Sequence, residues 1–465
     1  MVGIDAAIAA NRFGLGARPG DLQDIDRDPQ GWLRAQLAAG VATPSPVERL
    51  VHSGTLMKQV QQLRLAQRQD DAGDGDAVGR LKMSIRNELA PAYLKQVAAR
   101  VEVAVSSDQP FRERLVHFWS NHFAVSADKP ATIALAGTLE NEVIRPLATA
   151  RFADLLVAVV RHPAMLAYLD NLWSVGPNSR AAGRASRHVS RDARPGLNEN
   201  LAREILELHT LGVDGGYTQA DVTELARVLT GWSLGGGRGR FASGTPGSFH
   251  FREAIHEPGA RSVLGRRYPP GGEDQGEAVL RDLARQPATA QRIALKLARH
   301  FIADDPPPAA VTALERQFTR SDGDIAATCT ALLDCDAAWS TPLAKYKSPN
   351  DYLLSALRAL RQVPPRPEAA AAMFASLGQR IWTPGSPAGW PDTAVAWDGA
   401  DALMKRIEWA QAVAGRIGER VEARALADAV LGPVLGAHTR AMLTQSQDAV
   451  QALALLFVSP EFMRR

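Results

Sequence analysis

Cysteine is scarce in this sequence of 465 residues, which contains only Cys329 and Cys335. Two cysteines at that spacing form neither a zinc-binding signature nor the framework of a disulfide-rich domain. Long apolar runs are also missing, because no stretch reaches the roughly 18 consecutive apolar residues that a membrane-spanning helix needs. We therefore expect no membrane span, and we expect both cysteines to act as small buried hydrophobic residues.

A strong excess of charge is missing as well, since the formal net charge is only +3. So small a charge gives no argument for a nucleic-acid partner. The segment from Met1 to Ala6 lacks the basic region followed by an apolar core that marks an export signal. The sequence therefore predicts a cytoplasmic location, or export together with a partner that carries the signal.

Several familiar catalytic signatures are absent from the sequence: H-E-x-x-H, the Walker phosphate loop and C-x-x-C. The residues 231–235 do spell G-x-S-x-G around Ser233. A nucleophile elbow, however, requires a strand before the serine and a helix after it, whereas here a predicted helix ends at Leu229 and a Gly-rich loop follows. These patterns disfavour a zinc protease, a nucleotide hydrolase, dithiol chemistry and a serine nucleophile.

Helical periodicity, by contrast, is present along almost the whole chain, and sustained strand-like alternation is not. Two segments depart from this pattern. Residues 174–196 contain five arginines among glycines and serines, which predicts a flexible loop. Residues 234–268 are Gly-rich with short apolar pieces, which predicts a small β-hairpin or an irregular insertion. We therefore predict one large all-α domain over residues 1–465 that carries these two segments.

The segment 198–212 is predicted to be an amphipathic helix that stops at Gly212. Its polar face is unusually rich in carboxylates. The residues on that face are Glu199, Asn200, Arg203, Glu204 and Glu207. One interpretation is a solvated face with a local Arg203–Glu207 ion pair. The other is the wall of a cleft, where crowded carboxylates shift one another's pKa values for acid–base chemistry.

Three polar residues are predicted to lie on apolar helix faces: His122, Asp170 and His209. Each is either a hydrogen-bonded core residue or part of a site. Two histidines from separate helices, with a carboxylate such as Glu207, form a set that suits a divalent metal. A buried carboxylate at position 170 would need a partner or a proton.

Four tryptophans are predicted to lie in or beside loops: Trp232, Trp382, Trp390 and Trp397. Trp390 begins the sequence Trp-Pro-Asp, which ends at Asp392 in a turn rich in glycine and proline. Aromatic side chains in loops either anchor the loop in the core or form platforms on which sugar rings stack.

The central motif, 198–212, together with several shorter motifs, closely resembles the bacterial domain-of-unknown-function family 1800 (DUF1800). The other matching segments are 118–123 (FWSNHF), 163–171 (PAMLAYLDN), 216–222 (GYTQADV), 226–232 (ARVLTGW), 256–259 (HEPG) with 264–265 (LG), 347–349 (KSP), 389–391 (GWP) and 459–462 (SPEF). The resemblance extends over nearly the whole chain. It implies a predominantly helical fold, but no settled activity.

Members of the family often carry export signals and tend to be encoded beside another uncharacterised, exported family. The resemblance therefore implies a co-encoded exported protein as a partner. This sequence departs from the family pattern in two respects, since it has no visible export signal and its segment before Asn198 is rich in arginine.

Our leading hypothesis is a carboxylate-dependent hydrolase that acts on a saccharide-like substrate, which requires two carboxyl groups about 5–9.5 Å apart across a cleft. The acid–base candidates are Asp170, Glu199 and Glu204. The substrate-binding candidates are Asn171, Asn198, Asn200, Arg203, Trp232, Trp390 and Asp392.

Two alternatives stay open. The first is a metal-dependent enzyme in which His122, His209 and Glu207 hold a divalent metal; the leading hypothesis, in contrast, needs no cofactor. The second is a non-enzymatic assembly or binding partner of the co-encoded exported protein, with the Arg-rich segment 174–196 as its contact surface.

Overall fold

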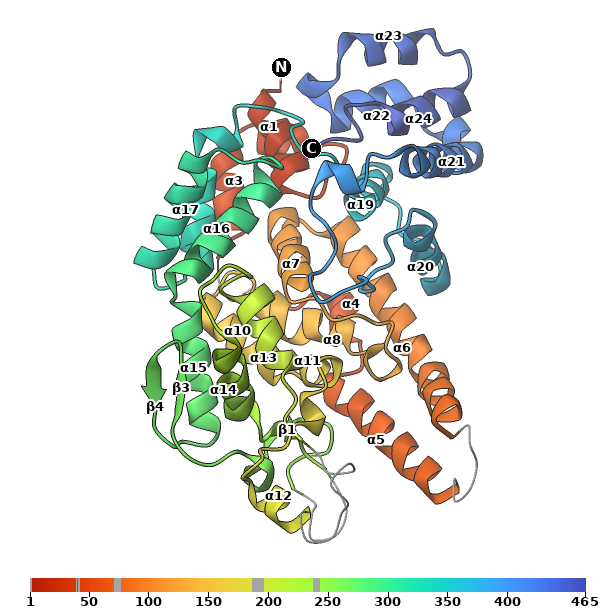
Figure 1. Cartoon of the computed structure of the whole chain (residues 1–465). Helices are drawn as coiled ribbons and strands as arrows, with labels where there is room; N and C mark the ends of the chain where they lie inside the picture. Colours follow the sequence, from red (N-terminus) through yellow and green to blue (C-terminus); the bar gives the residue numbers. More distant parts are fainter. Residues whose placement is uncertain (1, 39, 41, 71–76, 186–195, 237–242) are drawn as a thin grey trace.

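The computed structural model describes residues 2–38, 40, 42–70, 77–185, 196–236 and 243–465. These segments are predominantly helical, with two small sheets, which confirms the predicted fold class (Figure 1). None of the helices in them is both long enough and apolar enough to cross a membrane. Cys329 is buried as expected, and Cys335 is half-buried.

The helices follow one another with short connections. The first group is α1 (Ile4–Ile8), α2 (Asp21–Ile25), α3 (Pro29–Ala35), α4 (Ser45–Glu48), α5 (Ser53–Asp70) and α6 (Ala77–Ser106). The second group is α7 (Pro110–His122), α8 (Ala136–Leu139), α9 (Arg145–Leu147), α10 (Phe152–Arg161), α11 (Pro163–Tyr168), α12 (Arg180–Ala185), α13 (Asn200–Glu204) and α14 (Gln219–Leu229). The third group is α15 (Glu273–Ala284), α16 (Pro287–Phe301), α17 (Pro308–Arg320), α18 (Ile325–Leu333), α19 (Pro349–Leu360), α20 (Pro367–Ser376), α21 (Ala400–Ile417), α22 (Ala423–Val430), α23 (Ala437–Gln445) and α24 (Ala449–Val458).

Proline defines where many of these helices start. Helices α7, α11, α16, α17, α19 and α20 all have proline at the beginning of the first turn. Proline is suited to that position because its missing N–H would have no intrahelical acceptor there. Helix α14 begins instead with a capping box between Thr218 and Asp221.

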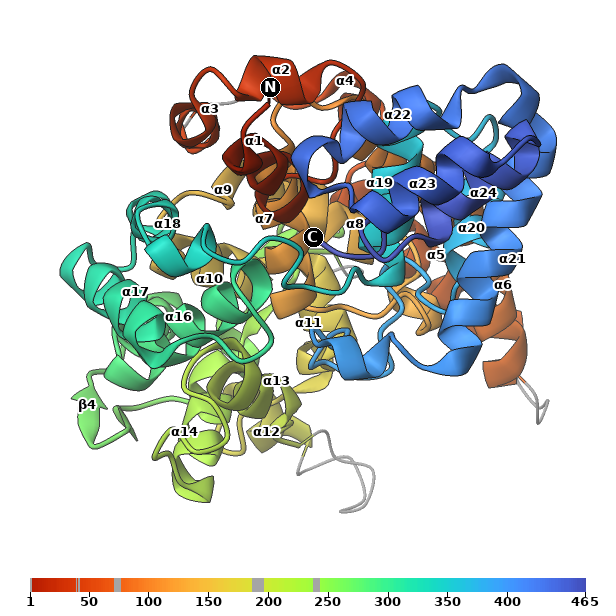
Figure 2. The same cartoon turned by 90° about the horizontal axis from the view of Figure 1, so that it is seen from above.

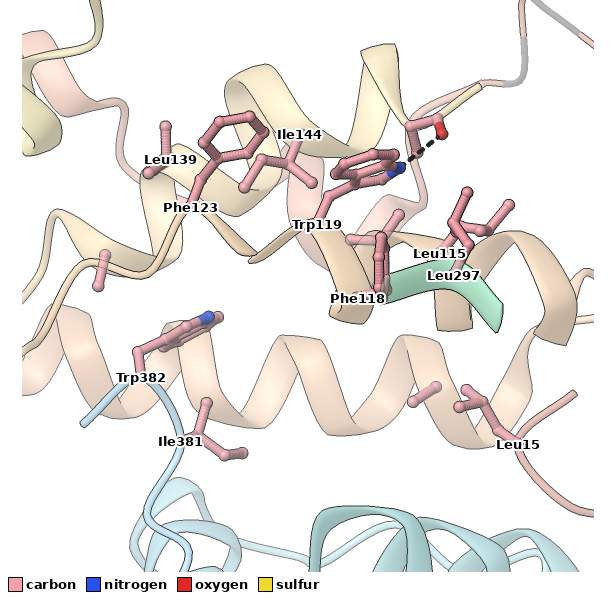
Figure 3. Packing of buried hydrophobic residues seen from close by; sticks show 14 of the residues in the cluster. Leu15, Leu115, Phe118, Trp119, Phe123, Leu139, Ile144, Leu297, Ile381 and Trp382 are labelled. Carbon is pink, nitrogen blue, oxygen red and sulfur yellow. Dashed lines mark hydrogen bonds between the residues drawn. The ribbon is translucent and has the colours of Figure 1, made fainter. Parts of the chain in front are cut away.

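Helix α7 lies in the middle of the molecule and is buried on almost every side (Figures 1 and 2). Its Trp119 is fully buried and donates a hydrogen bond from Nε1 to the Ala148 carbonyl at 3.1 Å. Figure 3 shows Trp119 and Phe123 packed in the apolar cluster that also contains Leu139 and Ile144. This helix therefore forms the centre of the core.

The segment 198–212 is helical, but it is not the single α-helix that the sequence predicted. Helix α13 begins at Asn200, and the chain widens into a π-helical turn over Ile205–His209. The Thr210 hydroxyl donates to the Ile205 carbonyl at 2.6 Å, which fits the wider turn. Gly212 ends the segment with φ of +94°, the left-handed stop that was expected. A π turn shifts the register of the side chains that follow it.

The predicted insertion forms two antiparallel two-stranded sheets within the described residues. Strand β1 (Trp232–Leu234) pairs with β2 (Phe249–Phe251), and β3 (Arg261–Val263) pairs with β4 (Arg266–Tyr268). Strand β1 starts two residues before the predicted insertion. Ser233 lies opposite His250 inside this sheet, with no helix directly after it. The strand-to-helix turn of a nucleophile elbow is therefore not present at Ser233.

The Arg-rich segment is in part helical. Residues 180–185 form α12, and its Arg180 lies 3.1 Å from Glu253. The prediction of a loop is therefore wrong for these residues, because Ser179 Oγ accepts a hydrogen bond from the Ala182 N–H and starts the helix. Residues 174–179 and 196 lie in neither a helix nor a strand, as predicted, and residues 186–195 lie outside the described residues.

The burial of Trp232 gives a testable prediction. Its side chain is fully buried and packs on Phe249, so Trp232→Ala should lower the free energy of unfolding by about 3–5 kcal/mol. Trp173, which is 54% exposed, is the matched control, and Trp173→Ala should cost about 1 kcal/mol or less. Urea unfolding of both variants measures the two values. Equal values would contradict a core role for Trp232.

Candidate functional site

Asp170 lies at the surface and not in the core. It follows α11 with φ of +59°, its side chain is 40% exposed, and it forms an ion pair with Lys129 at 3.3 Å. The expectation of a buried carboxylate is therefore wrong. The chain leaves the helix in a left-handed turn after Tyr168, which carries this side chain outward.

The polar face of 198–212 is occupied by local contacts. Glu199 accepts hydrogen bonds from the Thr223 hydroxyl at 2.7 Å and from Gln219 Nε2 at 2.8 Å. Arg203 lies 3.4 Å from Glu199 and 3.5 Å from Glu207, so one cation serves two carboxylates. These contacts agree with the interpretation of a solvated face, and α14 supplies the hydrogen-bond donors to Glu199.

Within the described residues, Glu204 is the one acid of this face that forms no ion pair. Its side chain is half-buried, and burial together with the neighbouring charge of Glu207 raises the pKa of Glu204. A raised pKa is what a general acid needs. Glu204 is, however, not among the residues that line the main cavity described below.

Four of the predicted substrate-binding residues make contacts within the fold. Asn171 is buried and donates hydrogen bonds to the carbonyls of Leu229 and Trp232. Asn198 accepts a hydrogen bond from the Asn200 N–H at 2.9 Å, next to the start of α13. Trp232 is in the core, as noted above. These contacts position backbone segments and leave little surface for a ligand.

A cavity of about 380 Å³ lies elsewhere, between α7, α16, the start of α19 and the segment 379–393. Three of the predicted site residues line it: His122, Trp390 and Asp392. The other charged or titratable residues that line it are Arg100, Arg114, His117, Lys296, Arg299, His300, Asp351 and Arg380. The structure therefore brings together three of the motifs quoted above, FWSNHF, KSP and GWP, at one cavity.

His300 and Asp392 form a close pair in this wall. His300 Nδ1 lies 2.6 Å from Asp392 Oδ2, and the His300 side chain is only 13% exposed. Burial lowers the pKa of His300 to about 4. Burial disfavours the charge of Asp392, but His300 and Lys345 outweigh it and lower the pKa of Asp392 to about 2. At neutral pH a neutral imidazole therefore donates from Nδ1 to a carboxylate.

The same arrangement determines the chemistry of the second ring nitrogen. With the proton on Nδ1, His300 Nε2 carries a lone pair and is a base. Nε2 is buried and has no hydrogen-bond partner among the described residues. Buried polar atoms without a partner are rare and often belong to functional sites.

Asp351, the second carboxylate of the wall, is held by two arginines. Arg114 lies 3.1 Å and Arg465 3.0 Å from its two oxygens. Burial disfavours its charge, but these arginines outweigh that effect and keep the pKa of Asp351 well below its usual range. Arg465 also donates to the His300 carbonyl at 2.9 Å, so the C-terminal residue of this sequence braces both sides of the site.

Lys296 has one hydrogen-bond partner within the described residues. Its Nζ donates to His122 Nδ1 at 3.0 Å, and no ion pair joins it to a carboxylate in the described segments. His122 Nε2 lies 3.1 Å from the His209 carbonyl, so it must be the protonated nitrogen. Burial, followed by the charge of Arg292, lowers the pKa of Lys296 to about 7.

The predicted metal ligands do not converge. The rings of His122 and His209 are both buried, as predicted, with centroids 6.2 Å apart, but both nitrogens of His122 are already engaged. Glu207 pairs with Arg203 instead. Among the described residues there is no group of three or more His, Cys, Asp or Glu side chains that could hold a metal ion.

The sequence matches the family described as a protein of unknown function (DUF1800) over residues 8–464. The chain therefore belongs to this family, as its motifs indicated. No curated protein and no solved structure shows a significant match.

Sequence reasoning missed Lys296 and His300, although one signal for them was available. Arg292, Lys296 and His300 recur at intervals of four along α16, so they form one basic stripe on an otherwise amphipathic helix. Nothing in the sequence indicated that Asp392 lies opposite this stripe.

The lowered pKa of Lys296 predicts a pH dependence of stability. Between about pH 7 and the ordinary lysine pKa near 10.4, the unfolded chain binds a proton that the native Lys296 lacks. Stability therefore rises with pH through this window, by at most about 1.4 kcal/mol per pH unit. Lys296→Met should lack this contribution. The unfolding free energy of the wild type minus that of the variant should therefore increase between pH 7 and pH 10. Parallel curves would refute the assignment.

Proposed function

We propose that this protein is an enzyme that acts on a small anionic substrate held in the cavity, with the His300–Asp392 pair as its general base. The observation that supports the proposal best is the charge of the cavity wall. Five side chains of the wall are cationic at neutral pH or titrate near it, and only two are carboxylates. The cations are Arg100, Arg114, Lys296, Arg299 and Arg380.

Carboxylates offset part of this positive charge, since Arg100 is also paired with Glu140 and Arg380 with Asp128. Asp351 is paired with Arg114 and Arg465, and Asp392 with His300 and Lys345. Lys345 and Arg465 add two buried cations just behind the wall. A cavity with such walls attracts anions, because the low-dielectric surroundings focus the positive potential.

The His300–Asp392 pair supplies the chemistry. The carboxylate holds the imidazole in one tautomer and stabilises the imidazolium that forms when Nε2 accepts a proton, as in other histidine–carboxylate pairs. The proton comes from a substrate C–H or O–H, or from a water molecule. The last case makes the protein a hydrolase.

A saccharide-like anionic substrate is the second candidate, and it is favoured by the aromatic part of the wall. Trp382 and Trp390 both line the cavity, and the Trp390 ring lies 5.9 Å from Trp397, whose indole donates to the Pro391 carbonyl at 3.0 Å. A tryptophan fixed in this way can stack on a sugar ring. The hydrolase hypothesis then stands, with the histidine–carboxylate pair in place of Asp170, Glu199 and Glu204.

Anion binding is the first test. Inorganic phosphate and acetate, titrated onto the full chain, should raise its melting temperature, because a ligand that binds only the native state stabilises it. Lys296→Met should weaken phosphate binding about 10- to 100-fold, since it removes one charge-assisted contact. Lys405→Met is the matched control, because Lys405 lies outside the cavity lining and should leave binding unchanged. Equal binding by both variants would contradict the proposed site.

Turnover is the second test. The full chain is screened against small carboxylates, organic phosphates and anionic sugars, and the variants are compared on the best substrate. His300→Gln should lower kcat/KM about 10²- to 10⁴-fold, because it removes the general base. Glu204→Gln should keep nearly the full activity and the native fold. The opposite outcome, in which Glu204→Gln loses activity and His300→Gln keeps it, would indicate that the active site lies at the acidic face of 198–212.

A further inference from the structure

We propose that Lys296 is an amine nucleophile that forms an imine with a 2-oxo acid bound in the cavity. The inference deepens the proposed function and rests on it, because it assigns the substrate class and a covalent step to the same cavity. The surroundings of Lys296 differ from those of Lys345 and Lys347, the two buried lysines nearby.

Lys345 and Lys347 are both buried and both have firm acceptors. Lys345 Nζ pairs with Asp304 and donates to the Asp392 carbonyl at 2.7 Å. Lys347 Nζ donates to the Phe462 carbonyl at 2.7 Å and lies 4.4 Å above the Phe462 ring. These contacts engage both amines inside the structure.

Lys296 makes instead a single hydrogen bond within the described residues, to the lone pair of His122 Nδ1. A nitrogen lone pair is an adequate acceptor for a neutral amine, but it is a poor substitute for the carboxylate that a buried ammonium requires. Arg292 and Arg299 lie close enough to disfavour a positive charge on Lys296 further. Burial and neighbouring cations are the two devices that make a lysine amine nucleophilic at neutral pH.

The substrate class follows from the position of Lys296 in the wall. Imine formation requires a carbonyl carbon, and the cationic wall requires an anion. A 2-oxo acid carries both groups on adjacent carbons, so its carboxylate can lie against the arginines while its carbonyl meets Nζ. Arg114 is the clearest partner for the carboxylate, because its Nη2 is buried and has no acceptor among the described residues.

The step is balanced without any further reactant. The Nζ lone pair attacks the carbonyl carbon and forms a C–N bond, while the C=O π electrons move to oxygen. The two protons of the neutral amine end on that oxygen, one of them by way of His122 Nδ1, and the oxygen leaves as water. No electron is gained or lost. The product is a neutral imine, which takes up one proton from water, and the positive charge of the protonated imine can then stabilise a carbanion at the adjacent carbon.

Reductive trapping of the full chain tests this inference. Pyruvate is the probe, sodium borohydride reduces any imine to a stable secondary amine, and peptide mass spectrometry locates the adduct. We expect one reduced pyruvate adduct, on Lys296. Lys347 is the internal control, because its pKa is also lowered to about 7 by burial but it does not line the cavity. Adducts spread over exposed lysines, or equal labelling of Lys347, would overturn the assignment.

Two variants separate a covalent role from a purely electrostatic one. Lys296→Arg keeps a cation and should still bind acetate, but it should give no trapped adduct. Lys296→Met should give no trapped adduct and should also bind acetate more weakly. Acetone, which has the carbonyl without the carboxylate, should be trapped far more slowly than pyruvate by the wild type.

The failure of this inference differs from the failure of the proposed function. If acetate and phosphate bind in the cavity and no pyruvate adduct forms, Lys296 is an anion-binding cation only and the imine is refuted. If neither binding nor an adduct is found, the proposed anion-binding cavity itself is refuted. If an adduct forms on Lys296 and competes with acetate, both proposals are supported.

Discussion

The burial of α7 is the constraint on which the rest of the structure depends. A helix that is enclosed on nearly all sides must find the partners of most of its polar side chains within the protein, because an unpaired buried charge is costly. Arg114 does so with Asp351, Glu113 with Arg145, Asn121 with the backbone of Trp390, and His122 with Lys296. These partners come from α9, α16, α19 and the 379–393 segment. The polar residues of one helix thus determine which distant segments surround the cavity.

Periodicity predicted the helical fold and the burial of His122 and His209. The Gly-rich composition of residues 234–268 predicted a small β-hairpin or an irregular insertion, and the structure has two small sheets there. The sequence did not predict the site, because a helical wheel assumes that a polar arc faces water. The arc of α7 that includes His117 is buried, whereas the arc of 198–212 is partly exposed and paired with α14. The pair of His300 and Asp392 joins residues 92 positions apart, a contact that no local pattern encodes.

The location of a loop tryptophan could not be predicted from the sequence, for a related physical reason. A tryptophan in a loop either returns to the core or faces a cavity, and local composition does not separate these two outcomes. Trp232 is fully buried beside Phe249, whereas Trp390 lines the cavity because Asn121 binds its backbone on both sides. Gly389, with φ of +82°, allows that approach, since a Cβ there would lie 2.3 Å from the Asn121 carbonyl.

The contacts of Arg465 also bear on how the molecule assembles. This residue binds Asp351, the His300 carbonyl and the Arg12 carbonyl, the last from a position 453 residues earlier in the sequence (Figures 1 and 2). Contacts between such distant positions form late, since they require the largest loss of chain entropy. The geometry of the wall behind Asp351 therefore depends on segments near residues 12, 300, 351 and 465 being folded together.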